Sequence, residues 1–133
     1  MRLTTLFFLP SLFVTTLQAS SLPTEVIEIM DQYRIALYLT EAQISSIPDW
    51  QPGAGEPPMS LQAAVGRVLE WIAKNPLLAD AQIYELKYKP VHNYEKFNRW
   101  YYLVELRMLA GKKQFVAVLP DGQVVSAIEE PGR

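Results

Sequence analysis

Apolar and polar residues alternate with a period of two along most of the second half of the chain. Because successive side chains of a strand point to opposite faces, this alternation predicts β-strands. Four segments follow the pattern: 81–90, 99–109, 114–119 and 123–128. In the second of these, Trp100 and Tyr102 share one face and are expected in the core, whereas Tyr101 on the other face is expected to be exposed.

Tight turns connect the last three of these strands. Ala110-Gly111-Lys112 and Pro120-Asp121-Gly122 are short, glycine-containing connections of the kind that join neighbouring antiparallel strands. The sequence therefore predicts an antiparallel meander within a sheet of about four strands. Its first strand is expected to place three aromatic and aliphatic side chains on one face: Tyr84, Leu86 and Tyr88.

A period close to 3.6 residues marks residues 60–74 as the main helix. Ser60 can cap its first turn, and the pair Asn75-Pro76 ends it. Its apolar stripe consists of Leu61, Ala64, Val65, Val68, Leu69 and Ile72. We expect this stripe, Leu69 included, to pack on the sheet, and Gly66 to mark the close approach of a neighbour. The fold class is then α+β, with one helix on an antiparallel sheet.

Residues 24–39 fit two patterns. The spacing of apolar residues over 24–32 allows a helical stripe, but residues 33–39 alternate strictly and are rich in β-branched and aromatic types. The sequence favours a strand over 33–39 paired with residues 26–30, and leaves open whether residues 24–32 are strand or helix.

Two further local signals follow this segment. Thr40 and Gln43 form a capping-box pattern, which predicts a short helix over residues 41–46. Residues 49–58 contain three prolines and two glycines after Trp50 and are expected to form a surface linker. Trp50 is expected to fold back from this linker onto the core.

The N-terminus has the features of an export signal. Met1-Arg2 is a positively charged start, Leu3 to Leu17 is almost entirely apolar or hydroxylated, and Ala19 offers a small residue for cleavage. An uncleaved amphipathic anchor is the alternative, but the apolar run has no polar face. We expect a signal peptide over residues 1–19, one domain over residues 20–133, and a periplasmic or secreted location without membrane attachment after cleavage.

Composition and charge exclude several classes of function. The 133 residues include no cysteine and one histidine, which excludes a disulfide scaffold, a thiol nucleophile and a multi-histidine metal site. The net charge of −2 comes without a clustered basic face, so nucleic acid is not an expected partner. We expect no metal and no cofactor.

The sequence offers no complete arrangement of catalytic residues. His92 is the only histidine, it lies in a loop, and no glycine-flanked serine accompanies it. Glu85 and Glu105 could supply paired carboxylates, but we expect them to pair across their strands with Lys87 and Arg107. The sequence does not predict an enzyme.

The loop from Val91 to Asn98 is the best candidate for a binding site. It is longer than its hairpin needs, and aromatic and basic residues gather in and beside it. Loops on a rigid sheet often carry binding residues. The candidate binding residues are His92, Tyr94, Phe97, Arg99 and Tyr101.

The order of these elements resembles the PepSY-like small exported domains. The resemblance is carried by Met59-Ser60-Leu61 opening a helix after two prolines, by Arg99-Trp100-Tyr101-Tyr102 in a strand, and by Pro120-Asp121-Gly122 in a hairpin. It covers roughly residues 33–131 and includes no catalytic residue. It implies a helix packed on an antiparallel sheet, somewhat like the cystatins, and in some members the inhibition or regulation of peptidases.

We therefore expect an exported, non-catalytic domain that binds a protein partner. Peptidase inhibition, an envelope role and an immunity role are the candidate contexts. The alternative is a binder of a small molecule, peptide or glycan that uses a pocket or the aromatic loop. Aromatic side chains on a flat surface would favour the first function, and a concave apolar pocket between helix and sheet would favour the second.

Overall fold

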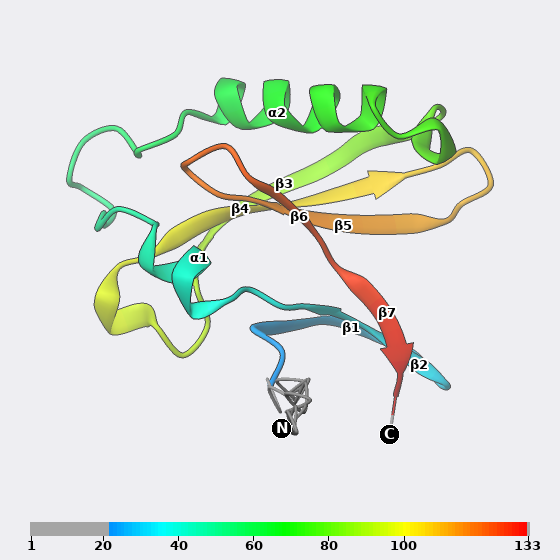
Figure 1. The fold of residues 1–133 in the computed structure, drawn as a ribbon, viewed down its shortest axis with the longest axis horizontal. Coiled ribbons are helices and arrows are strands. Elements are labelled where there is room, and N and C mark those ends of the chain that lie inside the picture. Colours follow the sequence, from blue (N-terminus) through cyan, green and yellow to red (C-terminus); the bar gives the residue numbers. More distant parts are fainter. Residues whose placement is uncertain (1–21, 133) are drawn as a thin grey trace, which may run out of the picture.

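One main helix and two antiparallel sheets form three layers (Figure 1). The structure, a computed structural model, describes residues 22–132. Helix α2 (Leu61–Ala73) covers one face of a four-stranded sheet, and a three-stranded sheet lies on the opposite face. The expected α+β class and main helix are confirmed, but the single sheet of about four strands is replaced by two sheets. The predicted signal peptide, residues 1–19, lies outside the described residues.

The four-stranded sheet is the predicted meander. Its strands follow the order β3 (Gln82–Pro90), β4 (Trp100–Arg107), β5 (Lys113–Val118) and β6 (Val124–Ser126). Each pairs with the next in antiparallel register. The two tight turns lie where the sequence predicts them, and Gly111 and Gly122 have φ angles of 83° and 95°.

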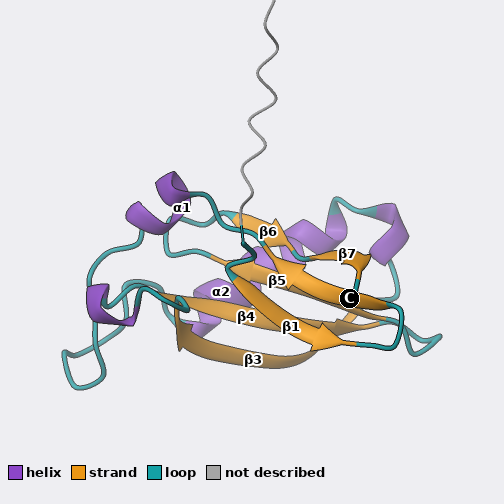
Figure 2. Ribbon diagram, turned by 90° about the horizontal axis from the view of Figure 1, so that it is seen from below, coloured by secondary structure: helices purple, strands orange, loops and turns teal. Residues whose placement is uncertain are grey.

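The three-stranded sheet resolves the ambiguity at the N-terminus in favour of strands. Its order is β1 (Glu25–Ile29), β2 (Tyr33–Leu37) and β7 (Ile128–Pro131). The first two form the hairpin that the sequence favoured, with a bulge between Val26 and Glu28. In the view from below, this sheet lies across the four-stranded one (Figure 2).

The C-terminal chain connects the two sheets. The sequence predicts one strand over residues 123–128, but the chain leaves the upper sheet after Ser126 and enters the lower sheet at Ile128 (Figure 1). Between them, the Ala127 amide donates to the carbonyl of Phe115 at 2.9 Å. The predicted single strand was wrong because alternation along the sequence does not reveal a change of pairing partner.

Both faces of the central strand β4 are consequently buried. Tyr102, Val104 and Leu106 belong to a core beneath α2, and Tyr101 and Leu103 belong to a second core between the sheets. Trp100, which was expected in the core, is half-buried beside Trp50 and Tyr88. The expected exposure of Tyr101 was wrong because its face of the sheet is covered by the three-stranded sheet.

A bulge in β3 changes the predicted alternation. The register shifts between Ile83 and Glu85, so Ile83 replaces Tyr84 on the face that packs beneath α2. Tyr84 is 57 % exposed, with the Arg107 guanidinium 3.3 Å above its ring. The predicted shared face of Tyr84, Leu86 and Tyr88 was therefore wrong at Tyr84.

Helix α2 begins and ends as predicted but is turned differently on the sheet. The Ser60 side chain accepts from the Ala63 amide, and Lys74 is the C-cap. The buried residues of α2 are Ala64 and Val68, whereas Leu69 is 54 % exposed. The apolar stripe is wider than the contact with the sheet, so the expected burial of Leu69 was wrong.

The remaining elements are short. Helix α1 (Glu41–Ser45) has the predicted capping box, with Thr40 and Gln43 bonded reciprocally. Residues 51–56 are exposed, and the ring centre of Trp50 lies 5.2 Å from that of Tyr88 on β3. Two 3-10 turns complete the fold: η1 (Pro76–Leu78) and η2 (Glu95–Phe97).

Candidate functional site

The loop between β3 and β4 is fixed by its own backbone. The amides of Tyr94 and Phe97 donate to the carbonyls of Val91 and Tyr94 at 3.0 and 2.9 Å. Asn93 and Asn98 adopt the left-handed conformation, with φ angles of 67° and 54°, which asparagine tolerates better than most residues. Turn η2 lies inside the loop, so its exposed side chains stand on an ordered scaffold.

Of the two aromatic side chains of the loop, one packs against the core and the other is exposed. Tyr94 is partly buried against the core between the sheets, and its ring centre lies 6.0 Å from that of Phe97. Phe97 is 48 % exposed, and the Lys96 ammonium lies 5.1 Å from its ring centre. Phe97 is thus the aromatic side chain of the loop that is available to a partner.

His92 is exposed, as its loop position predicts, and faces Glu95. His92 Nδ1 lies 3.5 Å from Glu95 Oε1. The pKa of Glu95 is lowered, first by its own backbone amide, then by that of Asn93, and further by His92. The loop therefore presents an ionised carboxylate beside an imidazole.

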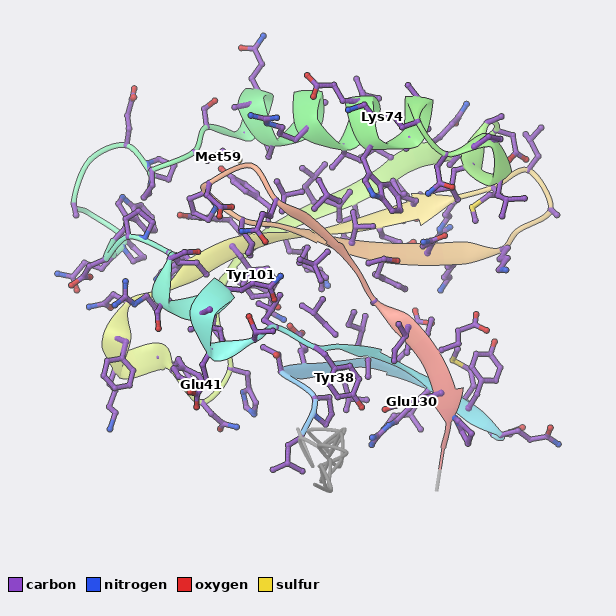
Figure 3. All side chains as sticks on the ribbon, in the orientation of Figure 1. Tyr38, Glu41, Met59, Lys74, Tyr101 and Glu130 are labelled. Carbon is purple, nitrogen blue, oxygen red and sulfur yellow. The ribbon has the colours of Figure 1, made fainter. Side chains whose placement is uncertain are left out.

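The other two predicted residues have internal roles. Arg99 donates through Nη1 to the carbonyl of Ile47 and forms a β-bridge with Asp49, so it joins the start of the linker to β4. Tyr101 is fully buried between the sheets (Figure 3). Its hydroxyl donates to Glu25 on β1. The sequence grouped these residues with the loop because they follow it in the chain.

Two hollows border the loop, one on each side of the segment 22–24. The larger, of about 690 Å³, lies against the β1 side and includes Arg34 and Lys89 in its wall. The smaller, of about 440 Å³, lies against α1 and includes Glu41 and Ile44. Both walls share five residues: Leu22, Pro23, Thr24, His92 and Asn93.

We call Leu22–Thr24, Glu41, His92, Asn93 and Phe97 the loop-end surface. Leu22 is 87 % exposed, and the Thr24 hydroxyl accepts from the amide of Leu39 at 2.7 Å, which joins this segment to the chain that follows β2. Sequence reasoning missed Leu22–Thr24 and Glu41 because the fold, not the chain order, brings them to the loop. No local motif could have identified them.

A third hollow, of about 130 Å³, lies between the sheets and contains the two glutamates considered as paired carboxylates. Glu85 and Glu105 are directly opposite in the register of β3 and β4. Lys87 Nζ lies 3.7 Å from Glu85, and Arg107 Nε lies 2.6 Å from Glu105. The expected pairing across strands was wrong, because each carboxylate is paired two residues along its own strand.

Two negative observations concern residues 22–132 only. Among them, no group of three or more His, Asp or Glu residues is placed to hold a metal ion. Within the same range, no helix combines the length and the apolar character that a membrane crossing requires.

Comparisons with models of protein families, with curated proteins and with solved structures found no match to this chain. The resemblance to PepSY-like domains therefore stays a prediction from the sequence.

Proposed function

We propose that this chain is an exported, non-catalytic domain that binds a protein partner with the loop-end surface. The observation that carries the proposal is the position of exposed His92 and Phe97 on an ordered loop, with His92 in the walls of two hollows. A surface that is ordered before binding avoids the entropic cost of ordering it on binding. The half-exposed Phe97 ring suits the role of an aromatic anchor.

The order of elements supports a PepSY-like domain as the more specific form of this proposal. Helix α2 is followed by an antiparallel four-stranded sheet, as the resemblance implies. Peptidase inhibition, an envelope role and an immunity role are the contexts that we propose for such a domain. Export is tested separately, by mass spectrometry of the N-terminus. An intact Met1 in the exported product contradicts it, and a start at Ser20 supports it.

A peptide or small ligand is the second candidate, and the hollows favour it. A volume of about 690 Å³ lies within the range of roughly 300–1,000 Å³ that is usual for ligand pockets. Its wall combines apolar Leu22 and Pro23 with the polar side chains of Arg34 and Asn93. An extended peptide could lie against this wall while its side chains enter both hollows.

The test compares a loop variant with a matched surface variant. The double substitution His92→Ala with Phe97→Ala removes two exposed side chains of the loop-end surface. The control, Leu77→Ala with Leu109→Ala, removes two side chains that are 89 % and 87 % exposed and lie elsewhere. Each tagged protein is used to capture partners from the envelope fraction of the exporting cell, and captured proteins are quantified by mass spectrometry.

We expect one protein or more to be recovered with the wild type and the control but lost with the loop variant. Equal recovery with all three proteins contradicts a role for the loop-end surface. Peptide and glycan arrays probed with the same three proteins address the second candidate. Binding there that depends on His92 and Phe97, without protein capture, would favour the ligand-binding function.

A further inference from the structure

One flank of α2 is apolar and faces solvent. Leu61 and Leu69 are 56 % and 54 % exposed, and Val65 between them is only partly buried. At about 100° per residue, these three side chains lie on one side of the helix, next to three small or uncharged residues. We call this set the α2 flank: Leu61, Gln62, Val65, Gly66, Leu69 and Ala73.

The charged residues of α2 lie on its other flank. Arg67 pairs with Glu70 at 3.7 Å, and its guanidinium lies beside Gly122 in the turn between β5 and β6. Lys74, the C-cap, follows on the same side at helical spacing. The solvent-facing side of a helix is normally charged or polar, so an exposed flank without a charged residue calls for an explanation.

Gly66 gives an independent indication. A glycine inside a helix costs about 1 kcal/mol relative to alanine. Its backbone is helical, and a Cβ placed on it would meet nothing within 4 Å. The expected close neighbour of Gly66 is therefore absent from the described part of the chain. A missing side chain on an exposed flank is useful where a second helix approaches closely.

We propose that the α2 flank is the contact between two copies of this chain, with their α2 helices antiparallel about a two-fold axis. The flank runs from residue 61 to residue 73, and a two-fold axis at its middle brings the apolar positions of the two copies opposite one another. Leu61 would face Ala73 of the second copy, and Leu69 would face Val65. Such self-complementarity is what a two-fold interface requires.

The absence of charge favours a second copy over a different partner. A foreign protein is usually selected by complementary charge around an apolar centre. The α2 flank offers no charged group for such selection. The same flank of a second copy, running in the opposite direction, presents matching apolar side chains. The proposal concerns a different surface from the loop-end surface and does not depend on the proposed function.

The expected dimer is weak. Thirteen helical residues extend over roughly 20 Å, and a single pair of such helices buries well under the ~800 Å² per partner of a standard interface. We therefore expect a reversible equilibrium that shifts to monomer on dilution. Sedimentation equilibrium over a wide concentration range measures it directly.

The decisive experiment uses two single substitutions, Leu61→Glu and Ala73→Lys, at opposite ends of the flank. Each adds a charge to the interface, so each protein alone should stay monomeric. In an equimolar mixture, the introduced carboxylate faces the introduced ammonium, and association should return. Both substitutions suit the helix, because an acidic residue is favourable in its first turn and a basic residue in its last. Circular dichroism and a urea midpoint confirm that both variants are folded.

Leu109→Glu is the matched control, since it places a carboxylate at an exposed leucine outside α2 and should dimerise like the wild type. A wild type that stays monomeric at every concentration overturns the proposal. A dimer that persists in the Leu61→Glu and Ala73→Lys proteins, each measured alone, also overturns it. An equimolar mixture of the two variants that fails to associate overturns the antiparallel arrangement.

Discussion

The hydroxyl of Tyr101 on β4 donates a hydrogen bond to a carboxylate oxygen of Glu25 on β1 and so links the two sheets. The other carboxylate oxygen of Glu25 accepts from the ammonium of Lys89 on β3. Burial, and then the contact with Glu25, raise the pKa of Tyr101. A polar contact of this kind fixes how the three-stranded sheet sits on the four-stranded one, because apolar packing alone is not directional.

We expect Tyr101→Phe to lower the free energy of unfolding by about 1–3 kcal/mol, as for the loss of a hydrogen bond to a charged group. The aromatic ring stays in the core between the sheets, so the difference in unfolding free energy measures the contribution of the hydroxyl alone. Urea denaturation of the two proteins measures the difference. Tyr94→Phe, at the loop, is the control and should leave the midpoint unchanged. An unchanged midpoint for Tyr101→Phe as well would show that the link to Glu25 contributes nothing.

Tyr101 also shows where sequence reasoning ends. Alternation correctly separated it from Trp100 and Tyr102, but alternation states only that two faces differ. Which face meets solvent depends on what else the fold supplies, and here β1, β2 and β7 cover the second face. Glu85, Lys87 and Glu105 lie on the same face of the sheet as Tyr101. Because these residues are charged, the sequence of that face is typical of a face exposed to solvent.

Local signals were the most reliable part of the sequence. The caps at Thr40 and Ser60 and the turn at Gly122 depend on a few neighbouring residues, and each was confirmed. The crossing at Ala127 and the bulge at Tyr84 depend on distant pairing partners, which a single sequence does not display. The candidate site depends on both local and distant residues. The loop was predictable from its composition, whereas its neighbours Leu22–Thr24 and Glu41 were not.

The orientation of α2 on the sheet predicts effects of different size for substitutions at two adjacent residues. Val68→Ala should cost about 1–3 kcal/mol, because Val68 is fully buried beneath the helix and its loss leaves a cavity. Leu69→Ala should cost less than about 1 kcal/mol, because that side chain is more than half exposed. Urea midpoints of both variants, measured at a concentration where the protein is monomeric, test this order. A larger effect at Leu69 than at Val68 is the result that this orientation of α2 forbids.

Substitution by alanine should change the free energy of unfolding in opposite directions at two glycines. Gly66→Ala should raise the free energy of unfolding of the monomer by roughly 0.5–1 kcal/mol, since the site is helical and open. Gly122→Ala should lower it by about 1–2 kcal/mol, because the φ angle of 95° lies in a region that L-residues rarely adopt. Thermal or urea unfolding distinguishes the two signs. Stabilisation by both substitutions would mean that the turn at Gly122 relaxes at no cost.

The carboxylate of Glu130 on β7 accepts from the hydroxyl of Tyr38, which lies beside it (Figure 3), at 2.7 Å. It also accepts from Arg34 Nε on β2 at 2.7 Å. Tyr38 first and Arg34 second hold the pKa of Glu130 below its ordinary value. The unfolded chain therefore takes up a proton at this residue at a higher pH than the folded chain does. The stabilisation by Glu130 is present above the unfolded pKa of about 4.3 and is lost as pH falls through the lower folded value.

Glu130→Gln should consequently flatten the fall in unfolding free energy below about pH 5, because a neutral amide has no proton to gain there. Urea denaturation at a series of pH values down to about 3 gives the slope for each protein. Glu129→Gln, which removes a carboxylate from the same strand but keeps the contact with Tyr38, should retain the steep slope of the wild type. If Glu130→Gln and the wild type lose stability in parallel as the pH falls, then the contact between β2 and β7 does not depend on the ionised form of Glu130, and the acid sensitivity of the fold has its origin elsewhere.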